Sequence, residues 1–79
     1  MTPYDPMTLN DVPIGASVRI RRLGGRPEMS VRLRELGFCE NAVIRCISRG
    51  YGSIICEVSH TRVGLDSTLA RRIHVSQSE

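Results

Sequence analysis

Aromatic side chains are scarce in this chain of 79 residues, which has two Tyr, one Phe and no Trp. Single-stranded nucleic acids are usually bound by stacking their bases on aromatic side chains, and grooves for Pro-rich peptides are lined with them. Tyr4 lies near the N-terminus, Phe38 follows a predicted helix end, and Tyr51 alone cannot form such a groove. The composition therefore argues against both kinds of binding domain.

Lysine is absent, so all eleven basic residues are Arg, and the net charge is +3. Six of them fall in the first predicted strand and helix, at Arg19, Arg21, Arg22, Arg26, Arg32 and Arg34. The positive field is therefore concentrated in this part of the chain, where it suits an acidic partner. A solvated basic face without a partner is the alternative interpretation.

The three cysteines do not form a disulfide or zinc pattern. Cys39, Cys46 and Cys56 are odd in number and include no Cys-x-x-Cys pair. Cys56 and His60 are four residues apart on a predicted strand and its turn, so we expect their side chains to share a face. Because a metal needs three or four ligands, a buried apolar Cys56 is the preferred interpretation. We expect no intrinsic cofactor, with adventitious zinc or iron at Cys56 and His60 as the weak alternative.

No stretch approaches the roughly 20 apolar residues of a membrane-spanning helix, and the N-terminus lacks the apolar centre of a signal peptide. Reduced thiols also fit the cytosol, so we predict a cytoplasmic protein without membrane insertion. No Ser-His-Asp or Cys-His spacing indicates catalysis. The glycines of Gly24-Gly25 and Gly50-Tyr51-Gly52 lack the Lys-Ser/Thr of a phosphate loop. We therefore predict that the protein is not an enzyme.

One stretch has a clear helix pattern. Met29, Leu33 and Leu36 recur at the i, i+4, i+7 spacing that places side chains on one helix face, so we assign them to the core. Pro27 suits the first turn, where its missing N–H is not needed. These features predict a helix over about 27–36.

Gly37 and Phe38 mark the end of this helix. Gly37 lies where helices close in the left-handed conformation, so we predict a positive φ there. In the Schellman closure the residue after the glycine folds back on the residue five before it, which pairs Phe38 with Leu33. Leu33, Leu36, Gly37 and Phe38 are thus predicted to be structural residues.

Alternation of apolar and polar residues predicts five short antiparallel strands, over 17–23, 42–48, 54–58, 63–65 and 73–75. Asp66 is expected to cap a single helical turn before the last strand. Leu9 and Val12 are expected to close one end of the core. Short strands at close spacing, with one inserted helix, predict an all-β fold in the form of a small barrel.

The two ends of the chain have no periodic pattern. Residues 1–7 carry Pro3 and Pro6, and residues 76–79 are polar. Both are predicted to be disordered tails on one domain over 8–75.

The order and spacing of these motifs resemble those of the FeoA family, over about residues 9–75. The resemblance rests on Arg32-Leu33 with Leu36-Gly37-Phe38, Ile44 and Cys46, Ile54-x-Cys56-x-Val58, Val63-Gly64-Leu65, Leu69-Ala70 and Ile73-x-Val75. Glu40-Asn41 replaces the usual Pro-Gly, and Asn tolerates the left-handed conformation of such a turn. The resemblance implies an SH3-like barrel of about five strands, with one short helix inserted after the first strand.

The resemblance also implies a function. It indicates an adaptor of bacterial ferrous iron uptake that binds the cytosolic part of a FeoB-like membrane GTPase transporter and assists Fe(II) transport. We expect a monomer or weak homodimer. A similar domain forms the last part of the chain in the repressors related to the diphtheria toxin repressor, but 79 residues leave no room for their DNA-binding and dimerisation segments. A small basic SH3-like nucleic-acid-binding module is the alternative function, although nucleic acid is not the expected partner.

An adaptor needs an outward surface for its partner. Arginine is favoured at interfaces because its planar donors bind carboxylates in pairs. We therefore hypothesise that Arg22, Arg26, Arg32 and Arg34 face acidic groups of the transporter, with the Tyr51 loop as the second candidate.

Overall fold

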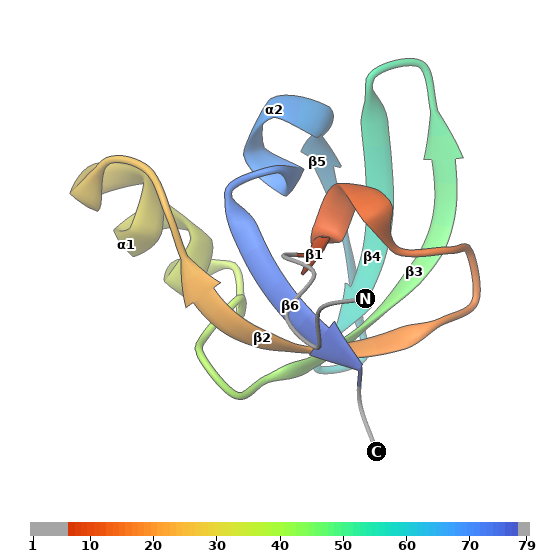
Figure 1. Cartoon of the computed structure of the whole chain (residues 1–79), viewed down its shortest axis with the longest axis horizontal. Helices are drawn as coiled ribbons and strands as arrows, with labels where there is room; N and C mark the ends of the chain where they lie inside the picture. Colours follow the sequence, from red (N-terminus) through yellow and green to blue (C-terminus); the bar gives the residue numbers. More distant parts are fainter. Residues whose placement is uncertain (1–6, 78–79) are drawn as a thin grey trace, which may run out of the picture.

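A computed structural model describes residues 7–77 of the chain, so residues 1–6 and 78–79 of the predicted tails lie outside the described residues. Nine elements follow one another along the chain (Figure 1). In order they are β1 (Met7–Thr8), the 3-10 helix η1 (Leu9–Asp11), β2 (Ser17–Leu23), α1 (Pro27–Glu35), β3 (Val43–Gly50), β4 (Ser53–Val58), β5 (Thr61–Asp66), α2 (Ser67–Ala70) and β6 (Ile73–Gln77).

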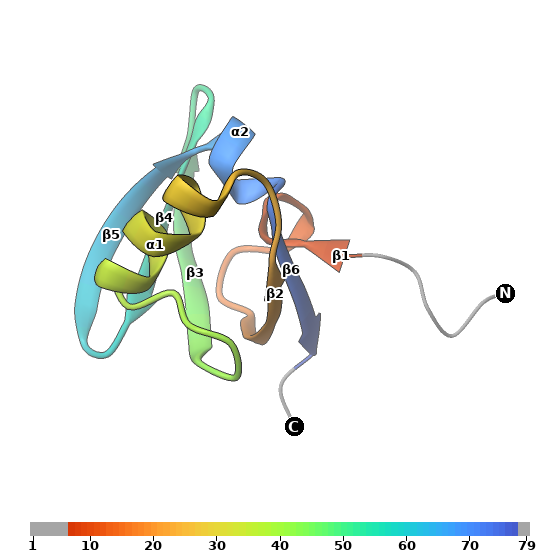
Figure 2. The same ribbon diagram turned by 90° about the vertical axis from the view of Figure 1, so that its left-hand side faces the viewer.

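The strands form one antiparallel sheet in the order β1-β6-β2-β3-β4-β5. The sheet curves round a single core, with β1 and β5 at its two edges (Figure 2). The predicted SH3-like all-β fold is confirmed, with six strands instead of five. The extra strand is β1, in which Met7 pairs with Val75 and Thr8 with His74.

Two predicted tail assignments are wrong. Met7 belongs to the sheet through its pairing with Val75, and β6 continues through Ser76 to Gln77. Ser76 and Gln77 pair with Arg19 and Val18 of β2. Backbone pairing holds these polar residues in the sheet, which side-chain periodicity does not reveal.

The core follows the predicted alternation on the strands. Val18 and Ile20 are buried on β2, and Ile54, Cys56 and Val58 on β4. Within residues 7–77 the buried set is entirely apolar. Leu9 and Val12, which were expected to close one end of the core, are also buried. The further core residues are Leu33, Phe38, Ile44, Cys46, Leu65, Ala70, Ile73 and Val75.

The helix α1 spans Pro27–Glu35 and closes as predicted. Gly37 has φ of 103°, and its N–H donates to the carbonyl of Arg34 at 3.0 Å. The Phe38 N–H donates to the carbonyl of Leu33 at 2.9 Å, which completes the Schellman pattern. Phe38 is fully buried, so this closure ties the helix end to the core.

The assignment of Leu36 to the core is wrong, because its side chain is 44% exposed. The helix ends one residue earlier, at Glu35, and Leu36 is the C-cap residue. The closure then turns the chain back, so that Phe38 is fully buried in the core while Leu36 is not. Leu33 is the only buried residue of α1.

Two short features were predicted correctly from single residues. The Asp66 carboxylate accepts a hydrogen bond from the Leu69 N–H at 2.9 Å and caps α2. Asn41 has φ of 74°, so it adopts the left-handed conformation inferred for the turn before β3.

Candidate functional site

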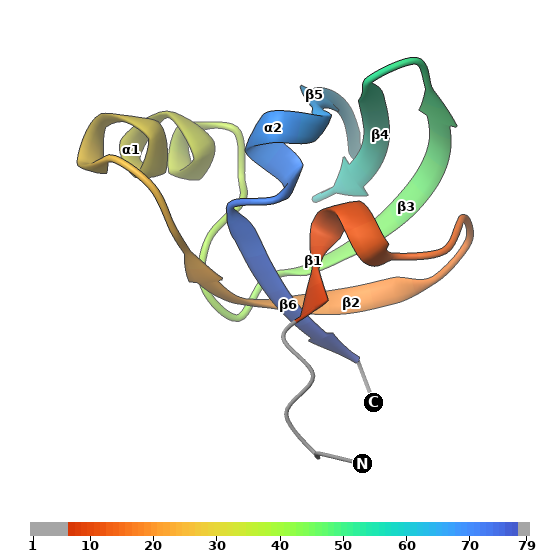
Figure 3. The same cartoon turned by 45° about the horizontal axis from the view of Figure 1, so that its top comes forward.

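The four predicted partner arginines are all exposed, but they have different neighbours. Arg22 lies on β2, Arg26 is the N-cap residue of α1, and Arg32 and Arg34 lie in the last turn of α1. Figures 1 and 3 show α1 to one side of the sheet, beyond the end of β2. The arginines on α1 therefore lie on an element that projects from the barrel.

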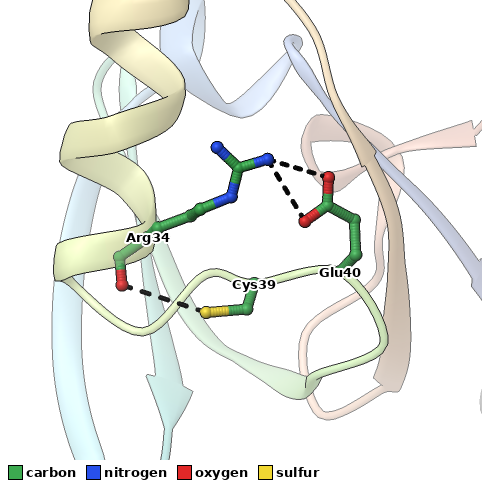
Figure 4. Close-up of polar contacts among 3 residues, drawn as sticks. All are labelled: Arg34, Cys39 and Glu40. Atoms are coloured by element: carbon green, nitrogen blue, oxygen red, sulfur yellow. Dashed lines mark hydrogen bonds and ion pairs between the residues drawn. The ribbon is translucent and has the colours of Figure 1, made fainter.

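Arg34 is paired within the chain. Its Nη2 lies 3.1 Å from Glu40 Oε2 and 3.4 Å from Oε1 (Figure 4). The pKa of Glu40 is lowered, first by a backbone hydrogen bond and second by the Arg34 side chain. The Cys39 thiol donates to the Arg34 carbonyl at 3.9 Å (Figure 4). Arg34 is thus partly neutralised before any partner binds.

Arg26 and Arg32 have no carboxylate partner within residues 7–77. The same helical region exposes two apolar side chains, Val31 at 52% and Leu36 at 44%. The surface of α1 therefore combines unpaired cations with exposed apolar groups. We call Arg26, Val31, Arg32 and Leu36 the helix surface.

Arg22 belongs to a different place on the molecule. Ile20 pairs with Val75 and Arg22 pairs with His74, so β2 has one extra residue at Arg21. Such a β-bulge breaks the alternation and redirects side chains. Without it, Arg22 would share the core face with Val18 and Ile20, whereas in the structure it is exposed.

Arg22 lines a pocket of about 470 Å³ between the end of β2, α2 and the start of β6. We call it the basic pocket. Its other lining residues include Gly25, Thr68, Arg71, Arg72 and His74, and none of the lining residues is acidic.

Prediction from the sequence did not include Arg71, Arg72 and His74 in any site. The adjacent pair Arg71-Arg72, two residues before His74, was the available signal. It could not be connected with Arg22, because 49 to 50 residues separate them and the bulged pairing of β2 with β6 brings them together.

A second pocket, of about 240 Å³, lies at another part of the sheet and differs in charge. Arg45 and Glu57 both line it, and they are direct partners in the pairing of β3 with β4. His60 also lines it. This pocket contains a carboxylate beside its arginine, unlike the basic pocket.

Tyr51, the second candidate contact, is fully exposed in the two-residue turn between β3 and β4. The neighbouring Gly52 has φ of 67°, which permits the tight turn. Tyr51 extends from the end of a hairpin and is well separated in sequence from the helix surface.

The prediction that Cys56 and His60 share a face is wrong. Cys56 is fully buried on β4, whereas His60 is exposed in the turn that follows. Ser59 and His60 have φ of 52° and 64°, so this turn interrupts the strand alternation. Within residues 7–77 there is no group of three or more His, Cys, Asp or Glu residues placed to hold a metal ion.

Cys56 is directly opposite Cys46 in the β3–β4 pairing, and both thiols are free. Burial raises the pKa of Cys56 to about 11, and the neighbouring Cys46 contributes in the same direction. Cys56 therefore stays a protonated, apolar core residue at neutral pH.

None of the helices over residues 7–77 has the length and apolar character needed to span a membrane.

The curved six-stranded sheet and its apolar core define a small SH3-like domain. The FeoA domain family matches residues 7–77, so the chain belongs to the FeoA family. Membership of this family gives it an accessory role in ferrous iron transport. No curated protein matches the sequence.

Solved structures share the fold at low sequence identity. An iron uptake regulatory protein (FeoA) is 22% identical with a TM-score of 0.82, over 91% of this chain and 96% of that one. A FeoA protein from Chlorobium tepidum is 17% identical with a TM-score of 0.86, over 92% and 71%. A manganese-dependent transcriptional repressor is 22% identical with a TM-score of 0.84, over 94% of this chain but only 44% of the repressor.

Proposed function

We propose that this protein is a cytoplasmic adaptor that binds the cytosolic part of a FeoB-like membrane GTPase transporter and assists Fe(II) transport. The observation that carries the proposal is the match of the FeoA domain to residues 7–77. The adaptor acts through protein contacts, with ferrous iron as the cargo of the transporter.

The helix surface is the proposed contact. Arg26 and Arg32 have no carboxylate within residues 7–77 to neutralise them, so acidic groups of a partner can bind them. Arg34 already shares its charge with Glu40, so its contribution is smaller. This refines the sequence hypothesis, which gave all four arginines equal weight.

The exposed apolar residues support the same surface. Protein interfaces commonly have an apolar centre with polar and charged groups around it, and Arg is enriched there. Val31 and Leu36 supply exposed apolar area on the same helical segment as Arg32. Because α1 buries only Leu33, most of its surface is available without disturbing the core.

The test is capture of the cognate transporter from membranes by the purified protein. Arg26→Glu with Arg32→Glu should reduce capture by about tenfold or more, because two attractive contacts become repulsive. The matched control is Arg71→Glu with Arg72→Glu, which makes the same change of net charge at exposed residues outside the helix surface. The control should retain capture.

Both double variants must first show the circular dichroism spectrum and melting temperature of the wild type. Equal capture by wild type and the helix variant would overturn the helix surface as the contact, and Tyr51→Ala would then test the hairpin. Ferrous iron uptake by cells that carry each variant as their only copy separates binding from transport. If the helix variant loses capture of the transporter but its cells take up ferrous iron as fast as wild-type cells, the assisting role is contradicted.

A further inference from the structure

The basic pocket is built on fixed backbone positions. The Gly24 N–H donates to the Arg72 carbonyl at 2.7 Å, which joins the end of β2 to the segment before β6. The Arg71 N–H donates to Ser67 at 3.1 Å and the Arg72 N–H to Leu69 at 2.9 Å. The starting points of both arginine side chains are therefore held by the end of α2.

Gly25 lies beside one of these arginines. Its φ of 93° favours glycine, and a Cβ at this position would lie 3.6 Å from Cδ of Arg72. The turn after β2 thus passes close along the Arg72 side chain. Gly24-Gly25 lacks the Lys-Ser/Thr of a phosphate loop, and the cations of this pocket come instead from β2 and the segment after α2.

The charge of the basic pocket is uncompensated. Arg22, Arg71 and Arg72 converge on it, and none of them has a salt bridge within residues 7–77. By contrast, the other two arginines of β2 have internal partners, since Arg19 donates to the Asn41 carbonyl and Arg21 to Ser76. Three neighbouring cations repel one another, so a bound anion would relieve this repulsion.

The donors indicate the class of anion. Each guanidinium offers several N–H groups in a planar arrangement, and Thr68 and His74 can add further hydrogen bonds. A single carboxylate has two oxygens and one charge, whereas linked phosphates present many oxygens and several charges. The pocket volume of about 470 Å³ exceeds one phosphate group and lies in the range of small-ligand sites.

No aromatic side chain lines the basic pocket, so it offers no surface for stacking a base. We propose that the basic pocket binds a small phosphate anion with several negative charges, of the diphosphate or triphosphate class. This site does not depend on the proposed binding of a transporter, because Arg71 and Arg72 are not part of the helix surface.

The experiment uses the purified full chain with inorganic pyrophosphate and tripolyphosphate as probes, at about 0.15 M salt to screen long-range attraction. Calorimetric titration gives the affinity, and amide chemical shifts locate the site. Shifts should concentrate at Gly24, Gly25, Thr68 and Arg72. The amide of Gly64, on β5 and outside the lining of the pocket, should not move. Shifts spread evenly over all exposed arginines would overturn the proposal.

Arg71→Gln with Arg72→Gln should weaken pyrophosphate binding by at least about tenfold, since two charge-assisted contacts are removed. Arg45→Gln with Arg62→Gln is the matched control, with the same change of net charge, and should alter the affinity by less than about twofold at this salt concentration. Equal weakening by the two variants would mean diffuse attraction and would overturn the site. The shift mapping on the wild type needs no variant to fold.

Two further probes test the ligand class. Citrate carries several carboxylates and should bind at least about tenfold more weakly than tripolyphosphate. Citrate binding of equal strength would overturn the phosphate class. A short single-stranded RNA should bind no more tightly than tripolyphosphate, because no aromatic platform lines the pocket. Tighter RNA binding that is lost in the Arg71 and Arg72 variant would overturn the small-anion proposal in favour of a nucleic-acid site.

Discussion

The sheet and the helical segment between β2 and β3 (residues 24–42) are held in place in different ways. Buried side chains from β2, β3, β4, β5 and β6 all meet in the core, and backbone pairing links each strand to its neighbours. The helical segment has far fewer attachments, since α1 buries only Leu33 and the turn after it buries Phe38. Its position therefore depends on a small number of residues.

This difference has a consequence for function. The polar contacts of the helical segment, such as the pair of Arg34 with Glu40, are exposed and contribute little to stability. Leu33, Gly37 and Phe38 are thus the main anchors. The rest of the segment is not needed for packing, so its exposed side chains are available for a partner.

The largest expected effect contrasts two leucines on the same helix. Leu33 is 1% exposed, and Leu33→Ala should lower the free energy of unfolding by about 2 to 5 kcal/mol through lost burial and a cavity. That is a large share of the roughly 4 to 12 kcal/mol expected for a domain of this size. Leu36→Ala, at a position 44% exposed, should cost less than about 1 kcal/mol. Urea denaturation measures both, and losses of similar size would contradict a helix anchored by Leu33.

A smaller effect is expected at the helix closure. Gly37→Val should lower the free energy of unfolding by about 1 to 3 kcal/mol, because a β-branched residue is strained at φ of 103°. Its side chain would also meet Val58, whose methyl groups lie 3.5 Å from the position of a Cβ. Thermal unfolding followed by circular dichroism measures the change.

The control for this variant comes from the sheet. Gly64 on β5 lies in extended structure, and no heavy atom lies within 4 Å of a Cβ placed there, so Gly64→Val should be nearly neutral. Gly52 lies in an exposed loop but is a weaker control, because its own φ of 67° would also strain a β-branched residue. If Gly37→Val and Gly64→Val melt at the same temperature, the closure does not anchor the helical segment.

The thiols give a pH-dependent contrast. The pKa of Cys56 is about 11 in the folded protein, against an ordinary value of 9.0. Between these pH values the unfolded state binds fewer protons than the folded state, so stability should fall as the pH rises from about 9 to 11. Chemical denaturation over this range should show a shallower fall in Cys56→Ala, and an identical slope would contradict the assignment.

Thiol labelling at neutral pH tests the same contrast without mutation. Cys39 is exposed in the helical segment, whereas Cys46 and Cys56 are buried in the sheet. A maleimide should therefore modify Cys39 in the native protein, and the two sheet thiols only after unfolding. Rapid native labelling of all three would show that the sheet opens far more readily than its packing implies.

The smallest effect is expected from the pair of Arg34 with Glu40. Because the pKa of Glu40 is lowered, the stabilisation by this carboxylate is present above the ordinary pKa of Glu and is lost as the pH falls through the lowered value. Glu40→Gln should remove this acid-range dependence with only a slight change at neutral pH, since the pair is exposed. A double-mutant cycle with Arg34→Gln isolates the coupling, and a coupling as large as the loss in Leu33→Ala would contradict this ranking.

Much of the fold could be read from local patterns. Alternation identified the inner faces of β2 and β4 because successive side chains on a strand point to opposite sides. The glycine and aromatic after the helix identified the closure at Gly37 and Phe38, since only a residue without Cβ adopts that conformation cheaply. The assignment of Leu36 to the core was wrong because the i, i+4, i+7 spacing places side chains on one face only while the helix continues, and α1 ends at Glu35.

The candidate sites were less predictable. The exposure of Arg32 and Arg34 followed from their place on the helix flank, but the partial neutralisation of Arg34 by Glu40 depends on the path of the turn after α1. The basic pocket could not be foreseen from Arg22 alone. It requires the bulge at Arg21, which turns Arg22 away from the core and places it opposite His74.

The sequence by itself determined the strand faces, the helix and its closure, because these depend on side-chain alternation and backbone sterics between near neighbours. Only the tertiary structure decided which surface residues lie together. The pairing of β2 with β6 joins Arg22 to Arg71, Arg72 and His74, although they are about fifty residues apart in sequence. Such proximity depends on strand register and on where one extra residue is inserted, and composition or spacing within a single segment contains neither.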